Sequence, residues 1–479
     1  MEAKYRWYVG AHEECLSIAK EGMETARRFG VRFSSLLETH GVYAYLTAGD
    51  VDAAERLLAQ TAASTSGGRL HRAQGCFLAF LCAFHRKDGL HALASAREAV
   101  ALAEGAGVPL AQGVYRAGLA LALFAQGRRR EALSCLAQAR RIARRIRSPS
   151  IEFSCTYTLT YFLLERGKHR HALPLLRRTL EVARQRGYMN RLFWTPEILS
   201  RLLGAALAHG IEVEHVRETI RRRGLLPTPD AAQLQHWPFP VRIYTLGRFS
   251  VLLDGKPLEF SGKAQRKPLE LLMALVAFGG REVSERQLTE ALWPDAEGDA
   301  AHQACAVALH RLRKLLGHDA AVTLQRNHFS LDGRLVWVDT WALDRALASY
   351  SDRTPAARTS ASEQVLALYQ GPFLGQQVDL GWAIPLRERL RVRFMRHLAE
   401  RGRVLFEAGE VGAAVALFEK GLSVDPLAEE FYRQLMVCYQ LLDRRAEAIG
   451  VYQRCEKTLA TLGVAPAPKT TALYQTLQN

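Results

Sequence analysis

The feature that most constrains the fold of this 479-residue chain is an internal repeat in its first half. Five pieces align by self-comparison, and each follows an apolar helical segment and starts a second one. Because such a period is typical of stacked helical hairpins, residues 1–226 are predicted to form a helical array. Small residues, which let two helices approach closely, stand at equivalent positions 39, 38, 40 and 40 residues apart: Cys15, Ala54, Ala92, Ala132 and Ala172.

The turns of the repeats support the same interpretation. Each piece opens with Gly or Lys-Asp where the chain must reverse: GAHEECL (10–16), GDVDAAERL (49–57), KDGLHAL (87–93), GRRREAL (127–133) and GKHRHAL (167–173). The array resembles tetratricopeptide repeats, in the longer-repeat form of MalT-like regulators. The resemblance implies a concave face that binds a regulatory protein or ligand, since such arrays seldom catalyse reactions. The repeat starts almost at residue 1, so we expect upstream sequence or a partner to cover that end.

The positive charge of the chain is concentrated in this array. The formal net charge is +16, and residues 1–226 hold 34 Lys and Arg against 20 Asp and Glu, while residues 241–338 hold 13 against 11. The array includes an Arg-rich segment with two alternative interpretations, a solvated helix face or a docking face for an acidic partner or nucleic acid. Its arginines are Arg128, Arg129, Arg130, Arg140, Arg141, Arg144, Arg145 and Arg147. Net charge therefore does not identify a DNA-binding segment.

A Pro-rich stretch without Lys or Arg, residues 227–240, is interpreted as a linker. Beyond it, VRIYTL and FSVLLD alternate in polarity and are followed by Asp254-Gly255, a dipeptide suited to a tight hairpin. A first helix is expected over about 264–278, and Ser284 with Gln287 predicts a capping box for a second. Asp299 is predicted to cap a third helix, and a hairpin (VTLQ, HFSL) and the strand LVWVD follow it.

The third helix, in 299–317, has two distinct sides. Cys305, Leu309, Leu312 and Leu316 recur at helical spacing and predict an apolar stripe. Cations and amide donors fall on the opposite side. Two interpretations are open at this point, an ordinary amphipathic surface helix or a recognition helix followed by its wing.

The order of sheet, three helices and hairpin in residues 241–338 resembles the OmpR/PhoB-type winged helix. The segments GKAQRKPLELLMALVAFGGREVSERQLTEALWPD and VALHRLRKLLG are similar to that family's first two helices and to the end of its recognition helix. The resemblance implies that the third helix enters the major groove, with Arg311 on a base and Val307 against a thymine methyl. It implies phosphate contacts by Gln303, His310, Arg313 and Lys314, and wing contacts by Arg326, Asn327 and His328. The Asn327-His328 tip and Pro268 depart from the family pattern.

Residues 339–479 resemble the bacterial transcriptional activator domain, a tetratricopeptide-like module that follows the winged helix in SARP-type activators. The resemblance is carried by residues before, between and after two paired helices in which Ala414 and Ala448 are the small packing positions. These residues are Tyr369, Gly371, Phe373, Leu374, Trp382, Asp425, Pro426, Leu462, Gly463, Val464, Pro466 and Pro468.

Several classes of function lack their sequence signals. The chain has no GxxxxGK[ST], HExxH or GxSxG motif and no clustered Cys and His ligands, so we predict no enzyme activity, no cofactor and no metal site. The eight cysteines are scattered at helical positions and are expected to be reduced and buried. No signal-peptide pattern or apolar run of membrane-spanning length occurs, so a cytoplasmic protein with no membrane contact is expected.

These observations predict a mainly α protein with four parts. They are a tetratricopeptide-like solenoid (1–226), a linker (227–240), a winged helix-turn-helix domain with small β-sheets (241–338) and a second tetratricopeptide-like helical domain (339–479). The predicted function is a transcriptional activator that binds double-stranded promoter DNA as a dimer or higher assembly. The family resemblance also implies contact with RNA polymerase. The alternative is a tetratricopeptide scaffold whose winged helix contacts proteins.

Overall fold

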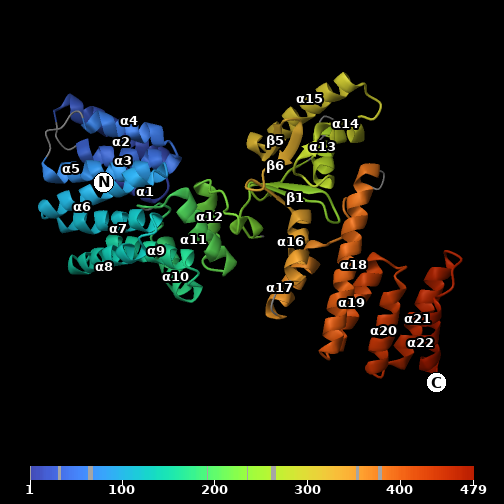
Figure 1. Ribbon diagram of the computed structural model, residues 1–479. Helices are drawn as coiled ribbons and strands as arrows, with labels where there is room; N and C mark the ends of the chain where they lie inside the picture. The colour runs from blue at the N-terminus through green and yellow to red at the C-terminus, as the bar shows by residue number, and fades with distance from the viewer. Residues whose placement is uncertain are drawn as a thin grey trace. The chain divides into compact units, whose positions relative to one another are not determined.

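The computed structural model describes residues 2–30, 34–62, 68–190, 192–234, 236–259, 266–351, 355–375 and 380–478. These residues are mainly α-helical and include two small β-sheets, which confirms the expected fold class. The chain divides into two compact units, Met1–Pro238 and Phe239–Asn479, and each is described by itself (Figure 1). The start of the expected first helix of the winged helix, 264–265, lies outside the described residues.

The first unit is a stack of antiparallel helices in which successive helices pack against each other (Figure 1). Its helices are α1 (Glu2–Tyr8), α2 (His12–Arg28), α3 (Ser34–Ala48), α4 (Val51–Ala62), α5 (Arg69–His85), α6 (Gly89–Gly105), α7 (Pro109–Ala125), α8 (Arg129–Arg145), α9 (Pro149–Glu165), α10 (His169–Gln185), α11 (Pro196–Ala208) and α12 (Val213–Arg222). A short 3-10 turn, η1, follows at Ala231–Gln233. The predicted array of helical hairpins is confirmed.

The residues that defined the repeat are either buried or placed in turns, as their chemistry predicts. The five aligned small residues are almost fully buried, with at most 1% of their surface exposed. At the turns, Gly127 and Gly167 have φ of 73° and 66°, a backbone conformation that glycine adopts without steric cost. Lys87 holds the same left-handed conformation (φ 63°) in the repeat that lacks this glycine. The chain therefore reverses identically whether or not the turn contains Gly.

The segment between α10 and α11 lies across the inner face of the array. Phe193 packs its ring 6.1 Å from that of Phe77 in α5, and Trp194 lies 4.5 Å from Tyr157 in α9. Both Phe193 and Trp194 are buried. Because α5 and α9 belong to different hairpins, this segment fills with its own side chains part of the face where the sequence predicted a partner.

The same segment reaches the first hairpin. The backbone carbonyl of Tyr8, at the end of α1, accepts hydrogen bonds from the N–H groups of Met189 (2.8 Å) and Asn190 (3.1 Å). Trp7 is buried and donates its indole N–H to the Thr47 hydroxyl at 2.9 Å. The first helix is thus held both by its neighbours in sequence and by residues about 180 positions away.

The stretch interpreted as a linker packs against the last helices of the array over much of its length. Ala231 and Trp237 are buried, and a Cβ added at Gly204 in α11 would lie 2.9 Å from the Ala231 methyl. The Ser200 hydroxyl donates to the Leu226 carbonyl at 2.8 Å. Ala231 and Trp237 therefore extend the core of the first unit.

The second unit begins with a winged-helix arrangement. One sheet has the strand order β3-β2-β1-β7, with β1 antiparallel to β2 and parallel to β7; the other has the order β4-β6-β5. The strands are β1 (Val241–Tyr244), β2 (Ser250–Leu253), β3 (Lys256–Pro257), β4 (Val283–Ser284), β5 (Val322–Gln325), β6 (His328–Leu331) and β7 (Val336–Val338). The predicted tight hairpin is present, since Asp254 and Gly255 both have positive φ (48° and 84°).

The three helices follow in the predicted order: α13 (Arg266–Ala277), α14 (Glu285–Leu292) and α15 (Gly298–Leu316). Pro268 lies in the first turn of α13, where its missing N–H costs no helical hydrogen bond. Ser284 caps α14 as predicted, because its hydroxyl accepts from the Gln287 N–H at 3.2 Å. The predicted cap of α15 is wrong: Glu297 is the N-cap residue, and Asp299 lies inside the first turn.

The remaining helices form a second helical stack: α16 (Asp339–Ser351), α17 (Pro355–Leu368), α18 (Ile384–Glu407), α19 (Val411–Val424), α20 (Glu429–Leu441), α21 (Arg445–Ala460) and α22 (Pro468–Gln478). Two short 3-10 turns, η3 (Asp319–Ala321) and η4 (Gly381–Ala383), complete the unit. Ala414 and Ala448 are fully buried, as expected of packing positions. Tyr369 stacks on Phe394 of α18 with ring centroids 4.0 Å apart.

A buried carboxylate joins the winged helix to these helices. Asp339, the first residue of α16, accepts hydrogen bonds from the Thr245 hydroxyl (2.7 Å) and from the N–H groups of Leu246 (2.7 Å) and Thr340 (2.8 Å). Burial raises the pKa of Asp339 to about 6, and its hydrogen bonds act in the opposite direction. The Leu374 N–H also donates to the Thr245 carbonyl at 2.8 Å, so both connections meet at the end of β1.

Candidate nucleic-acid interface

Helix α15 is divided into a buried and an exposed side, as the residue spacing predicted. The residues of the apolar stripe are at most 4% exposed: Cys305, Leu309, Leu312 and Leu316. The exposed side carries five of the predicted DNA contacts: Gln303, Val307, His310, Arg311 and Lys314. The buried stripe therefore fixes the rotation of the helix, so that these five side chains face solvent together.

Three of the predicted contacts share one hollow with residues of the preceding helices. Gln303, Val307 and Arg311 line a surface groove of about 440 Å³ together with Lys267 at the start of α13 and Trp293 just after α14. Val307 is 45% exposed, which is unusual for a valine on a packed helix. The groove combines a guanidinium, an amide, an ammonium and apolar surface, the mixture with which proteins read base edges.

Lys267 and Trp293 are members of this surface that the sequence analysis missed. The Lys267 ammonium lies 5.6 Å from the centre of the Trp293 ring and donates to the Leu292 carbonyl at 3.1 Å. It also lies 2.9 Å from the Glu270 carboxylate. Burial alone would raise the pKa of Glu270, but hydrogen bonds from Lys267 and Arg266 hold that pKa below its usual value. The signal in the sequence was a basic residue in the first turn of the first helix, immediately before a proline.

Arg313 lies at the margin of the exposed side and braces the wing. It is half-buried, and its Nε donates to the Val322 carbonyl of β5 at 2.9 Å. This hydrogen bond joins α15 to the first strand of the hairpin. This hydrogen bond gives Arg313 a bracing role within the domain, and its phosphate contact stays a prediction.

The wing hairpin β5–β6 closes with a two-residue turn, Arg326-Asn327, between the paired residues Gln325 and His328. Both turn residues have positive φ, 49° and 62°, the geometry of a type I′ turn. The His328 ring nitrogen Nδ1 lies 2.9 Å from the Arg326 carbonyl. Arg326 and Asn327 are exposed at the tip, while His328 is half-buried.

The wing tip is hydrogen-bonded to the start of α14. The Glu285 N–H, at the start of α14, donates to the Asn327 carbonyl at 2.9 Å. The Glu285 carboxylate is in turn 2.6 Å from His302 Nδ1 in the first turn of α15. The wing tip, α14 and α15 are thus connected through one residue. The structure places the predicted contacts in two groups, the exposed side of α15 and the wing tip, and none of the wing residues lines the groove.

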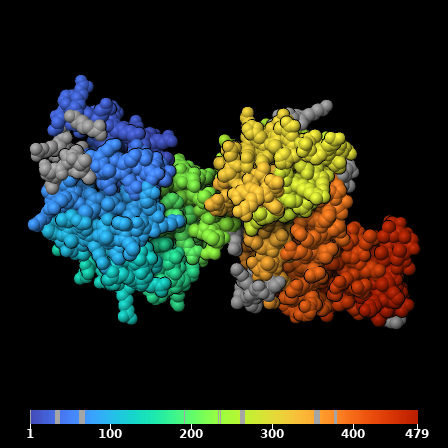
Figure 2. Space-filling view, turned by 45° about the horizontal axis from the view of Figure 1, so that its top comes forward, coloured from blue at the N-terminus to red at the C-terminus, as the bar shows by residue number. Residues whose placement is uncertain are grey.

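Figure 2 shows the winged helix, yellow-green to light orange, on the surface of the second unit. Among the described residues, no group of His, Cys, Asp and Glu is arranged to hold a metal ion. All eight cysteines are free, and seven of them are buried. Within the described part of the chain, no helix is both long enough and apolar enough to cross a membrane.

Comparison with known proteins shows what the second unit is similar to. Residues 338–478 match the family model of the bacterial transcriptional activator domain. The second half of the chain is similar to SARP-type regulators. The transcriptional regulatory protein EmbR of Mycobacterium tuberculosis is 29% identical over 243 residues, 48% of this chain and 61% of that protein. The regulatory protein AfsR of Streptomyces griseus is 30% identical over 237 residues, 48% of this chain and 24% of AfsR.

These matches span less than two thirds of either relative. A solved structure of Mycobacterium tuberculosis EmbR, in complex with a low-affinity phosphopeptide, aligns with 50% of this chain and 65% of its own at 23% identity and a TM-score of 0.39. The match to the family model and the likeness to the two regulators in sequence confirm the resemblance to SARP-type activators for the second unit. The relatives are named as regulators, and the lack of enzyme activity in this chain stays a prediction.

Proposed function

We propose that the chain is a sequence-specific DNA-binding transcriptional activator. The observation that carries this proposal is the exposed side of α15. A buried apolar stripe aims Gln303, Val307 and Arg311 into one groove, beside a wing that is hydrogen-bonded to the same helices. The match of residues 338–478 to an activator domain supports the same conclusion.

The proposed mode of binding follows from the side-chain chemistry. Helix α15 enters the major groove, where Arg311 donates two hydrogen bonds to a guanine and Val307 touches a thymine methyl. Gln303, His310 and Lys314 contact flanking phosphates and set the register. Arg313 contributes by holding the wing in place.

The wing supplies a second contact. Arg326 projects from the exposed type I′ turn and would place a cation on the minor groove or the adjacent backbone. Asn327 and His328 complete this tip. Because Glu285 links the tip to α14 and α15, the two groups of contacts are held in a fixed relation to each other.

The remaining assignments complete the proposal. We assign four parts with the boundaries predicted from the sequence: 1–226, 227–240, 241–338 and 339–479. The activator domain contacts RNA polymerase or a second protomer bound at a neighbouring promoter repeat, and the protein acts in the cytoplasm. The helical array receives a signal, as a regulatory protein or as a ligand.

Selection of bound fragments from random and genomic DNA by the purified full chain tests the proposal. We expect enrichment of one motif, and binding that weakens steeply as salt rises because phosphate contacts release counterions. Failure to enrich any motif at moderate salt would contradict it and favour the scaffold alternative.

The Arg311→Ala variant sharpens this test. It should lose about 1–3 kcal/mol on the selected site and relax base preference at one position. The matched control is Arg403→Ala, which removes the same charge from the exposed surface of α18. Equal losses in the two variants would show that Arg311 contributes charge alone.

A further inference from the structure

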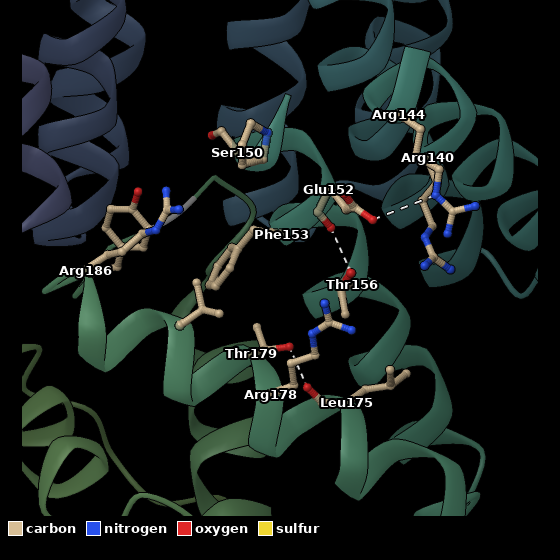
Figure 3. A pocket seen from close by; sticks show the side chains of 13 residues that line it. Arg140, Arg144, Ser150, Glu152, Phe153, Thr156, Leu175, Arg178, Thr179 and Arg186 are labelled. Atoms are coloured by element: carbon tan, nitrogen blue, oxygen red, sulfur yellow. Dashed lines mark hydrogen bonds and ion pairs between the residues drawn. The ribbon is translucent and has the colours of Figure 1, made fainter. Parts of the chain in front are cut away.

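A basic hollow in the helical array lies between α8, α9 and α10 and has a volume of about 460 Å³. Four arginines line it: Arg140 and Arg144 from α8, Arg178 from α10, and Arg186 just after α10. Figure 3 shows Arg140 and Arg144 on one side of the hollow and Arg186 on the other, with Arg178 between them. One acidic residue, Glu152, belongs to the same lining.

The positive charge of the hollow is poorly compensated by the protein. Arg140 and Arg144 are four residues apart on one helix, a spacing at which like charges destabilise the helix. The Glu152 carboxylate is 3.8 Å from the Arg144 guanidinium, so it partly neutralises one of the four cations. Among the described residues, the buried Nε of Arg140 has no hydrogen-bond partner. Leaving a buried N–H of a cation unpaired is costly, and an anion in the hollow would remove that cost.

The remaining lining indicates the shape of the anion. Phe153 is buried at the base of the hollow, and Leu175 and Val182 of α10 add apolar surface. Pro149 and Ser150, at the first turn of α9, bring the positive end of a 17-residue helix to the rim. The volume is that of a site for a small organic molecule.

We propose that this hollow binds a small organic phosphate with an aromatic or aliphatic body. The guanidinium groups of Arg140 and Arg178 hold the phosphate oxygens, because Arg donates paired hydrogen bonds that match phosphate geometry. Phe153 and Val182 contact the apolar body. The hollow is lined mainly from α8, α9 and α10, and the proposal does not depend on the DNA-binding proposal.

The probe for this site is 1-naphthyl phosphate, compared by calorimetry with inorganic phosphate and with 1-naphthol on the full chain without DNA. We expect saturable binding of 1-naphthyl phosphate that is at least about 10-fold tighter than either half-molecule, since both the charge and the ring are used. Equal affinity for 1-naphthyl phosphate and inorganic phosphate would contradict the proposal, and so would an absence of binding.

The matched variants change charge inside and outside the hollow on the same two helices. Arg140→Gln/Arg178→Gln should weaken binding about 10-fold or more, because hydrogen bonds to a charged group are lost. Arg141→Gln/Arg177→Gln removes the adjacent exposed cations, which do not line the hollow, and should leave the affinity within about 2-fold. Equal weakening in both variants would mean attraction to general positive charge and would overturn the site.

A third variant is expected to increase the affinity for the phosphate instead of lowering it. Glu152→Gln removes the carboxylate that repels an anion and should tighten binding by about 2–5-fold, the effect of one partly exposed charge. A misfolded variant would not bind more tightly, so this result separates a direct effect from damage to the array. Weaker binding by Glu152→Gln would contradict the placement of the anion beside it.

Discussion

The helical array and the winged helix differ in both the amount and the placement of their positive charge. The array has 34 basic against 20 acidic residues, and several of its arginines are held in ion pairs, such as Arg86 with Glu55 and Arg201 with Glu165. The winged helix is close to neutral, with 13 basic against 11 acidic residues. Yet it places Arg311 and Lys314 together on the exposed side of one rigid helix.

The difference teaches that the arrangement of a few side chains indicates a nucleic-acid interface better than net charge does. Cations dispersed over a curved array attract polyanions weakly and without register. Donors held on one helix face, with an apolar contact among them, can distinguish bases. The array's own strongest feature, the basic hollow, is suited in size to a small anion.

The largest expected effect concerns the inner face of the array. Trp194→Ala should lower the free energy of unfolding of the first unit by about 3–5 kcal/mol, because it empties a buried site packed against Tyr157. Denaturant unfolding measures this change. The control Leu90→Ala removes an exposed side chain and should change stability by less than about 0.5 kcal/mol. A small effect of Trp194→Ala would mean that the inner face is open to a partner.

A smaller expected effect is a difference between the two units in how their stability depends on pH. Burial lowers the pKa of His397 in the second unit to about 4, and this ring lies 3.0 Å from the Ser362 hydroxyl. As pH falls from 7 to 5, the unfolded chain takes up a proton that the folded ring does not, so stability falls by about 2 kcal/mol. Asp339 acts oppositely: its pKa is raised to about 6, so its contribution is lost as pH rises through 6 and regained on acidification, by about 1 kcal/mol.

Denaturant unfolding of His397→Gln and Asp339→Asn at pH 7 and pH 5 checks these signs. The first variant should become more stable on acidification than the parent chain, and the second should lose more stability than the parent does. In the array, burial likewise lowers the pKa of His85 to about 4, so its contribution is also lost as pH falls below 6.5. The first unit should therefore be the more acid-sensitive. A second unit that weakens more than the first would contradict this comparison.

The smallest expected effect concerns the wing tip. Arg326 has a positive φ (49°), so Arg326→Gly should stabilise the second unit by about 0.5–1 kcal/mol by relieving backbone strain. The same change removes a proposed phosphate contact, so DNA affinity should fall. The slope of log affinity against log salt concentration should become shallower by about 1, the effect of losing one phosphate contact. Asp254→Gly is the control, because it relieves similar strain (φ 48°) in the β2–β3 turn, outside the proposed interface. Unchanged DNA binding by Arg326→Gly would exclude the wing tip from the interface.

Local patterns predicted the elements because they reflect local physics. The buried stripe of α15 was evident from the spacing of Cys305, Leu309, Leu312 and Leu316, and the turns of the array from Gly and Lys-Asp. The cap of α15 was misplaced by two residues, from Glu297 to Asp299, because both acidic residues suit the positive end of a helix. A sequence does not show which of two such neighbours adopts the extended backbone of a cap.

The members of the candidate interface that were missed depend on distant contacts. Lys267 and Trp293 join Arg311 in one groove because α13 and α14 pack beside α15, and no periodicity within α15 contains that information. Arg313 was assigned to phosphate contact, but the neighbouring strand places a carbonyl within reach of its Nε. The partner is nine residues away in the sequence but lies 2.9 Å from the Arg313 Nε in the folded chain.

The amino-acid sequence by itself determined the repeat, the order of the winged-helix elements and the exposed side of α15, since periodicity and turn chemistry act between residues close in sequence. The tertiary structure decided which surfaces remain available for binding. Phe193 and Trp194 fill part of the array's inner face, and Arg140, Arg144, Arg178 and Arg186 converge on one hollow from two helices and the end of one. Those outcomes depend on how far the array curves, and curvature is the sum of packing contacts that no single repeat specifies.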